Sequence, residues 1–148
     1  MGKRTAITRF TKLSPFSNTP TYATDGSAGV DLYSSEDATL MPGERKLVGT
    51  GIAVEFHEGF TLFICPRSGL AKNSGVTVLN SPGIVDSDYR GEVKVLLVNM
   101  GNMPYSIKCG DRIAQGVLVN ISRGTWKEEP SLSDGTGRGS GGFGSTGK

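Results

Sequence analysis

The chain has few of the residues on which several common kinds of site depend. It holds one histidine, His57, and two cysteines, Cys65 and Cys109, which lie far apart and form no C-x-x-C pair. Histidine-based zinc sites and Ser-His-Asp catalysis are therefore disfavoured. We expect His57, which lies beside a turn, to have no catalytic role. We expect both cysteines to be buried, reduced thiols of a cytosolic protein.

Net charge and long apolar runs are lacking as well. The net charge is only +2, so composition indicates no nucleic-acid partner and no membrane partner. No apolar run approaches the ~20 residues of a membrane span. The segment Met1–Ala6 lacks the apolar core of a signal peptide, and Ala6 does not fit the myristoylation pattern. The sequence thus predicts a cytoplasmic protein.

Helical periodicity is also missing, since no 12-residue stretch has a convincing helical pattern and Ser68–Asn73 suits only one helical turn. Short apolar or alternating runs, separated by turn signals such as Pro42-Gly43, predict strands at 5–13, 28–34, 46–56, 60–65, 76–80, 92–99, 105–109 and 113–121. This pattern indicates an all-β sandwich, jelly roll or barrel. A length of 148 residues fits one domain, with a core over 1–123 and a glycine-rich segment over 124–148.

The stretch Asn80–Gly91 concentrates polar side chains between two strand-like runs. Pro82-Gly83 marks a turn, and an amide, two carboxylates, a phenol and a guanidinium follow within the connection. Loops on a rigid sheet are where binding and catalytic groups gather. We interpret this loop as the base of a small-molecule site, although a solvated turn with a structural Asp-Arg pair explains the stretch alone equally well.

Three other stretches are candidates for binding phosphate or metal. Arg67 and Ser68 follow a strand and suit anionic oxygens, although a capped turn with a surface arginine is an alternative. Asp111 and Arg112 are expected to form a structural charge pair, and Gln115 could reach a phosphate or a water. Asp31 could hold a water of a hard cation such as Mg²⁺, or be an ordinary surface carboxylate.

The glycine-rich segment has two interpretations. Gly137-x-Gly139-x-x-Gly142 matches the dinucleotide fingerprint in form, but no strand precedes it and no helix follows, so we reject that function. Arg138, Phe143 and the hydroxyl residues Ser145 and Thr146 suit a lid over a triphosphate and a base. A flexible tail is the alternative, and we expect Trp126 to pack the start of this segment.

Five of these stretches occur in an order that resembles a known family, the trimeric deoxyuridine triphosphatases (dUTPases). The stretches are Ala28–Leu32, Pro66–Ala71, Gly83–Gly91, Gly110–Gln115 and Arg138–Gly147. The resemblance runs from about residue 24 to the C-terminus. It implies a jelly-roll-like β fold, a homotrimer whose C-terminal segments close over neighbouring sites, and hydrolysis of dUTP to dUMP and pyrophosphate with Mg²⁺. Nucleotide-pool sanitation and dUMP supply would be its metabolic roles.

The resemblance also assigns roles to individual residues. Asp86 corresponds to the residue that activates the attacking water, Tyr89 to the residue that packs on the deoxyribose, and Asn80 to the reader of the uracil edge. Asp31 corresponds to a carboxylate that reaches the metal through water. The further substrate-binding positions are Arg67, Ser68, Gly69, Gly83, Val85, Gln115, Arg138, Phe143, Gly144, Ser145 and Thr146.

Two departures and three rivals accompany the resemblance. Gly116 stands where a bulky aliphatic residue is expected, which puts local packing in doubt, and Cys65 before Pro66 is unusual. A dCTP deaminase shares the fold, but the segment around Phe143 argues against it. A non-catalytic nucleotide-binding relative would be expected to lose Asp86 or the tail, and both are present. A carbohydrate-binding β-sandwich explains neither the motif order nor the tail.

Overall fold

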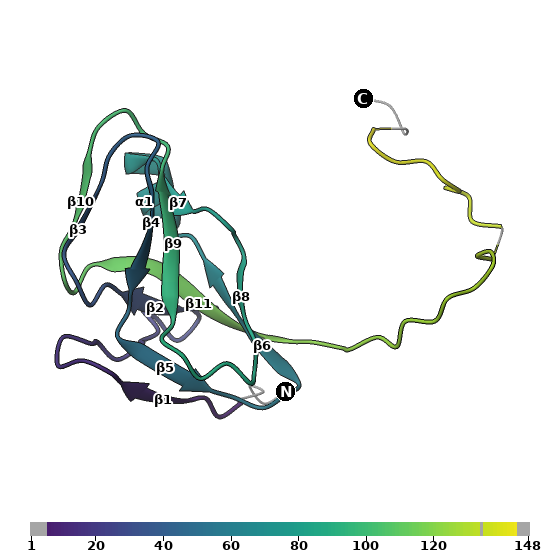
Figure 1. Ribbon diagram of the computed structural model, residues 1–148, viewed down its shortest axis with the longest axis horizontal. Coiled ribbons are helices and arrows are strands. Elements are labelled where there is room, and N and C mark those ends of the chain that lie inside the picture. Colours follow the sequence, from purple (N-terminus) through teal and green to yellow (C-terminus); the bar gives the residue numbers. More distant parts are fainter. Residues whose placement is uncertain (1–5, 134, 145–148) are drawn as a thin grey trace.

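The computed structural model describes residues 6–133 and 135–144, which form an almost wholly β body and a C-terminal arm (Figure 1). The first strands are β1 (Arg9–Lys12), β2 (Val30–Tyr33), β3 (Ala38–Leu40), β4 (Arg45–Gly49), β5 (Ile52–Glu55) and β6 (Phe60–Cys65). The one helix in this part of the chain, α1 (Ser68–Ser74), precedes β7 (Val76–Val78), β8 (Gly83–Val85), β9 (Lys94–Asn99), β10 (Tyr105–Ile107) and β11 (Arg112–Asn120).

The strands form four antiparallel sheets. The largest has the order β2-β11-β6-β8, and a second has the order β4-β9-β7. Two-stranded sheets pair β1 with β5 and β3 with β10. Neighbours in the sheets are mostly distant in sequence, as in a jelly roll. The predicted all-β, jelly-roll-like fold class is therefore confirmed.

The core lies between the sheets and follows the alternation of the strands. The face Val93, Val95, Leu97 that the sequence predicts is buried, and β2, β3, β5, β6, β7 and β11 contribute most of the other apolar core side chains. Asn99 is also buried, but its amide donates to the carbonyl oxygens of Leu40 and Met103. Its burial is therefore compensated by hydrogen bonds.

Several local expectations need correction. The run 46–56 is two strands, because Gly51 has a left-handed φ of 67° and turns the chain between β4 and β5. The three-residue strands β3 and β8 were not predicted, whereas the equally short β7 and β10 were. Cys109 is exposed rather than buried, and Trp126 is 98% exposed rather than packed. The expected first strand spans only β1, and its start at residue 5 lies outside the described residues.

The structure explains how β11 packs with glycine at position 116, where a bulky aliphatic residue was expected. A Cβ there would lie 3.2 Å from Leu62 Cδ1 and 3.4 Å from Val30 Cγ2. The side chains of β6 and β2 thus already fill the space that a bulky aliphatic residue at 116 would occupy.

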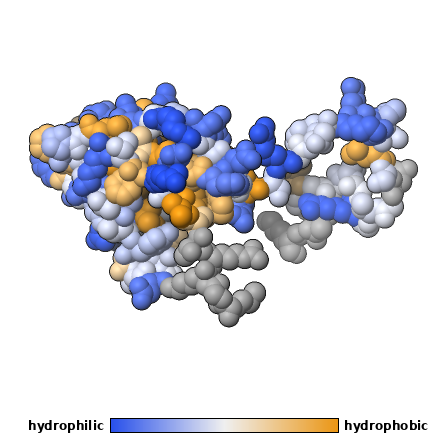
Figure 2. All heavy atoms as spheres, turned by 90° about the horizontal axis from the view of Figure 1, so that it is seen from below, coloured by the Kyte–Doolittle hydropathy of each residue, from blue (hydrophilic) through white to orange (hydrophobic). Residues whose placement is uncertain are grey.

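The arm leaves the body after β11 and extends away from it (Figure 1). Figure 2 shows the same separation from a second direction, with the arm clear of the body. Hydrogen bonds within the arm join residues close in sequence, such as the one from Arg138 Nε to the Gly141 carbonyl at 2.8 Å. Across residues 6–133 and 135–144, no helix has the length and hydropathy needed to cross a membrane.

Candidate active site

The connection between β7 and β9 is held at both ends. The two strands pair antiparallel, with Val78 opposite Leu97, which confirms the predicted hairpin arms. Within the connection, Gly83 is buried, and a Cβ there would lie 3.2 Å from Ile64 Cβ and 3.3 Å from Asn80 Nδ2. The glycine therefore lets the chain approach β6 closely while the Asn80 amide lies across the turn. Asn80 itself is exposed and available to a ligand.

Asp86 follows β8 directly, at the edge of the largest sheet. β8 pairs with β6, and the Val85 carbonyl accepts a hydrogen bond from Thr61 Oγ1 at 2.9 Å. The strand therefore ends at a fixed point, and the exposed Asp86 carboxylate projects from it. Sequence and structure agree that this carboxylate lies on a rigid support.

Residues 86–90 form a tight turn with several internal hydrogen bonds. The Tyr89 amide donates to the Asp86 carbonyl at 3.1 Å. Arg90 Nη1 donates to the carbonyl oxygens of Ser87 and Tyr89, and its Nη2 lies 4.0 Å from Glu55 Oε1 on β5. These contacts indicate that Arg90 holds the shape of this loop.

A pocket of about 270 Å³ adjoins this turn, lined by Leu47, Ile84, Val85, Asp86, Tyr89, Glu92, Val93 and Lys94. Its walls are mainly apolar, with the Asp86 carboxylate at the edge. Pockets for whole small-molecule ligands usually measure about 300–1,000 Å³. One chain therefore offers room for only part of a nucleotide here.

A larger hollow of about 800 Å³ lies against Asp86 and Asp88 on another side of the loop. The lining of this hollow contains three acidic side chains, Glu58 and these two aspartates. Its basic side chains are Arg123 and His57. Acidic side chains therefore outnumber the arginine and the histidine in this hollow, which makes it a poor place for an anionic ligand.

The predicted phosphate ligands gather at a different place, around Asp31. The Asp31 side chain is 15% exposed and lies between two guanidinium groups, Arg112 Nη1 at 3.3 Å and Arg67 Nε at 3.7 Å. Arg67 Nη1 also donates to the Arg112 carbonyl at 2.9 Å. This network fixes both arginines at one end of the largest sheet.

Arg112 is a site residue that sequence reasoning missed. The sequence suggested a pair between Asp111 and Arg112, but Asp111 Oδ2 accepts from the Lys108 amide, and Arg112 pairs with Asp31 instead. Asp111 lies just before β11 and Arg112 is its first residue, and neighbouring residues of an extended chain point in opposite directions, so these two charges are poorly placed to pair. That alternation was the signal in the sequence that could have identified Arg112.

Gln115, Ser68 and Gly69 lie near the same end of the sheet. Gln115 faces Cys65 across the β6–β11 ladder, and its Nε2 donates to the Pro66 carbonyl at 3.0 Å. Ser68 and Gly69 open α1 and are exposed, with nothing within 4 Å of a Cβ built at Gly69. The chain thus leaves open space beside the two arginines.

Partial burial raises the pKa of the Cys65 thiol, which keeps it protonated at neutral pH.

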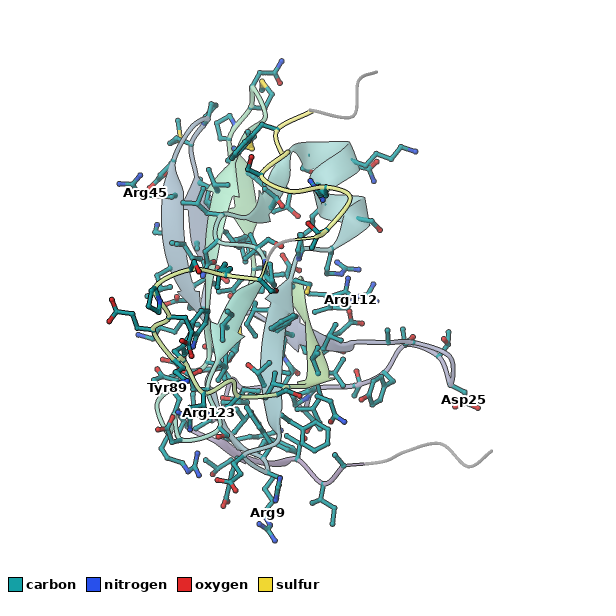
Figure 3. All side chains as sticks on the ribbon, turned by 90° about the vertical axis from the view of Figure 1, so that its right-hand side faces the viewer. Arg9, Asp25, Arg45, Tyr89, Arg112 and Arg123 are labelled. Atoms are coloured by element: carbon teal, nitrogen blue, oxygen red, sulfur yellow. The ribbon has the colours of Figure 1, made fainter. Side chains whose placement is uncertain are left out.

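These two groups of residues do not meet within one chain. β8 runs antiparallel to β6, so Val85 faces Leu62, whereas Arg67 follows the other end of β6. The three steps from Leu62 to Cys65 alone span about 10 Å at the usual rise of a strand. Figure 3 shows Tyr89 and Arg112 on opposite sides of the body. Asp86 and Tyr89 therefore lie apart from the residues around Asp31 within one chain, and we call these two clusters half-sites.

The arm meets neither half-site. Phe143 is fully exposed, and it has a φ of 51°, a backbone conformation that a bulky side chain rarely adopts. Gly144 beside it also has a positive φ, 89°. The predicted ligands Ser145 and Thr146 lie outside the described residues.

A divalent metal ion would have to be held mainly by a ligand's own oxygens. No group of three or more histidine, cysteine, aspartate or glutamate side chains gathers anywhere in the described ranges. Among the described residues, Asp31 is the carboxylate that lies between Arg67 and Arg112, and both of its oxygens already face guanidinium groups. Mg²⁺ typically keeps several waters and binds one or two carboxylates together with substrate phosphates. The residues fit that arrangement and do not fit an all-protein cage.

Comparison with known proteins agrees with the sequence resemblance. The dUTPase family model matches residues 17–147. Two curated relatives are each named deoxyuridine 5'-triphosphate nucleotidohydrolase. The one from Nautilia profundicola is 53% identical over 137 residues, covering 93% of this chain and 96% of its own. The one from Wolinella succinogenes is 54% identical over 140 residues, covering 95% and 93%.

The fold also matches solved structures of this family. A Staphylococcus bacteriophage 80alpha dUTPase with dUPNHPP superposes with a TM-score of 0.90 at 25% identity, covering 96% of this chain and 99% of the phage chain. A dUTPase from Staphylococcus aureus phage phi11 superposes with a TM-score of 0.80 at 22% identity, covering 86% and 99%, and shares the fold. From the motif order, the matched residues and the two close curated relatives, we conclude that the chain belongs to the dUTPase family.

Proposed function

We propose that this dUTPase hydrolyses dUTP to dUMP and pyrophosphate by an in-line attack of water that Asp86 activates. The observation that carries the proposal is the position of Asp86, an exposed carboxylate at the fixed end of β8 and beside an apolar pocket. Such a group can accept a proton at a defined place. The phage 80alpha relative was solved with dUPNHPP, which supports a nucleoside triphosphate as the ligand class.

In the proposed step, a water oxygen bonds to the α-phosphorus while its proton passes to Asp86. The bond between the α-phosphorus and the oxygen that bridges to the β-phosphorus breaks, and pyrophosphate leaves with that oxygen. Phosphoryl transfer depends on positioning and charge compensation more than on covalent chemistry by the protein. The rigid end of β8 supplies the positioning, and the arginines compensate charge.

We assign recognition of the base and the sugar to the hairpin between β7 and β9. The Asn80 amide, held over Gly83, is placed to exchange hydrogen bonds with the edge of uracil. A buried polar edge left without its partner strongly disfavours the wrong base. Tyr89 forms a wall of the pocket, where its ring would pack on the deoxyribose and leave no room for a 2′-hydroxyl. Gly83 and Val85 bring the backbone close to the nucleoside.

Phosphate binding falls to the other half-site and the arm. Arg67, Ser68, Gly69 and Gln115 would contact the triphosphate, and Arg138, Gly144, Ser145 and Thr146 would close over its terminal phosphates. Phe143 would stack on uracil, which is worth about 1–3 kcal/mol. Mg²⁺ on the phosphates would lower their charge, with Asp31 bonding to one of its waters. A phi11 phage relative coordinates a structural Mg(II) ion, which supports the choice of metal.

We further propose a homotrimer in which every site combines several copies. The two half-sites lie at opposite ends of β6, and the arm stands clear of both, so one chain alone cannot surround a nucleotide. Closed cyclic symmetry would place the hairpin of one copy against the phosphate-binding residues of the next copy. It would also bring the arm of a further copy to the same site. Leu47 and Ile84 beside the pocket, both more than half exposed, are available for such an interface.

A pyrophosphate-release assay across the deoxynucleoside triphosphates and UTP, with Mg²⁺ and with EDTA, tests the proposal. We expect release from dUTP with Mg²⁺, a loss of most activity with EDTA, and little release from dTTP, dCTP or UTP. The dUMP formed should equal the pyrophosphate released. Ammonia release from dCTP would instead indicate a deaminase, and binding of dUTP without turnover would indicate a non-catalytic relative.

A further inference from the structure

Tyr89 lies against its own chain rather than free in solvent. Its phenol oxygen donates to the Glu92 carbonyl at 3.0 Å, so the ring spans the backbone of residues 90 and 91. The ring remains 46% exposed, with one side lining the pocket beside Asp86. Its position therefore depends on what lies beneath it and on where the Glu92 carbonyl is held.

The space beneath the ring is the missing side chain of Gly91. A Cβ built on Gly91 would lie 2.6 Å from Tyr89 Cζ and 3.0 Å from Cε2, closer than real Cβ contacts. Gly91 does not have a positive φ, so its backbone conformation is open to any residue. The nearest atoms to the built Cβ all belong to Tyr89, so we attribute the need for glycine to the ring.

The carbonyl that receives the phenol is fixed by the turn between β4 and β5. Glu92 Oε1 accepts from the Gly51 amide at 2.9 Å, and a Cβ on Gly49 would lie only 2.6 Å from that oxygen. The next residue, Val93, donates its amide to the Ile52 carbonyl at 2.8 Å. Residues 92 and 93 thus belong to the body, and the phenol has a stationary acceptor.

We infer that Gly91 is a positioning residue for sugar specificity, because its missing Cβ lets the Tyr89 ring lie flat on the chain at the depth that excludes a 2′-hydroxyl. The inference rests on the proposed role of Tyr89 at the deoxyribose. An alanine at 91 would leave the backbone intact and displace the ring from the position in which it excludes a 2′-hydroxyl. The ring would then lose both its acceptor and its fixed distance from the nucleotide.

The test measures kcat/KM for dUTP and for UTP in the full-length enzyme. We expect Gly91→Ala to lower the dUTP-to-UTP ratio by about tenfold or more, a size typical of misplaced contacts in a substrate pocket. Gly26→Ala is the matched control, because nothing lies within 4 Å of a Cβ at that glycine and its φ is not positive. An unchanged ratio in Gly91→Ala would overturn the inference.

Two further variants separate this inference from the proposed function. Tyr89→Ala should lower the same ratio; if it does not, the sugar role of Tyr89 is wrong, whatever Gly91 does. In the Tyr89→Ala background the clash is absent, so Gly91→Ala should fold and leave the ratio as it is. A further drop in the double variant would show that Gly91 acts on specificity other than through the ring, and would overturn the inference even if the single variant failed to fold.

Discussion

The carboxylates of Asp31 and Asp86 have different surroundings, and these surroundings suit them to different roles. Asp31 is 15% exposed and lies against the guanidinium groups of Arg67 and Arg112. Asp86 is exposed at the end of β8, beside a mainly apolar pocket. The first is suited to fixing cations at a phosphate site, and the second to receiving a proton from a bound water.

Asp86→Asn is therefore expected to lower kcat for dUTP by about 10²–10⁴-fold, the usual contribution of a general base. The amide keeps the size of the side chain but accepts a proton poorly, so binding of a non-hydrolysable dUTP analogue should change little. Steady-state kinetics and calorimetric titration measure the two effects. Asp88→Asn, two residues along the same loop, serves as the control, and an Asp86→Asn enzyme with normal turnover would remove the assignment.

Much of the site could be assigned from residue identities, but its pairings could not. The motif order indicated Asp86, Tyr89, Arg67 and Gln115, because each lies in a short stretch typical of the family. The partnership of Asp31 with Arg112 depends on the register of β2 against β11, which includes a bulge between Arg112 and Ala114. A single sequence does not specify such a register. The roles of the individual ligands remain predictions.

At the scale of elements, most strands were predictable, including the three-residue β7 and β10, but β3 and β8 were not. β6, β9 and β11 have apolar faces that the sequence displays, and all three occur where expected. β3 and β8 are three residues long, and their strand conformation comes from pairing with β10 and β6. Because tertiary pairing rather than local pattern forms them, a sequence-based analysis overlooks them.

β11 offers a test of packing at this scale. A strand interior ordinarily gains stability when glycine is replaced by a β-branched residue. At Gly116 we expect the reverse, because Leu62 and Val30 already fill the space, and overpacking typically costs about 1–3 kcal/mol. Gly116→Val should lower the free energy of unfolding in urea by that amount. Gly124→Val, in open space, should have little effect, and a stabilised Gly116→Val protein would contradict this account.

In the whole molecule, the arm carries large apolar side chains that do not pack on the body. Trp126, Leu132 and Phe143 are each at least 86% exposed on the arm, an unusual number of large apolar side chains left in water. The sequence predicted a lid from the glycines around Phe143. In a single chain these side chains have no apolar surface against which to pack. The structure of one chain therefore does not show how the lid closes.

A mixing experiment tests whether the sites are shared. A chain lacking residues 136–148 should fold and assemble but hydrolyse dUTP poorly, and Asp86→Asn chains should also be nearly inactive. If each site takes Asp86 and the arm from different copies, an equal mixture refolded together should recover activity in about a quarter of its sites. Light scattering would check the assembly state. A mixture as inactive as its components would mean that Asp86 and the arm act within one chain.

The stiffness of β6 has a geometric consequence for the assembly. Both ladders of β6, to β8 and to β11, hold it straight between Asp86 at one end and Arg67 at the other, so it acts as a spacer of constant length. In the proposed homotrimer, neighbouring copies could not adjust the distance between the two half-sites of one chain and could only bring matching ends together. Adding or removing a pair of residues would keep every side chain on its face yet change the spacing by about 7 Å, more than the length of a phosphate group. The length of β6 would therefore fix the spacing that the proposed homotrimer has to match.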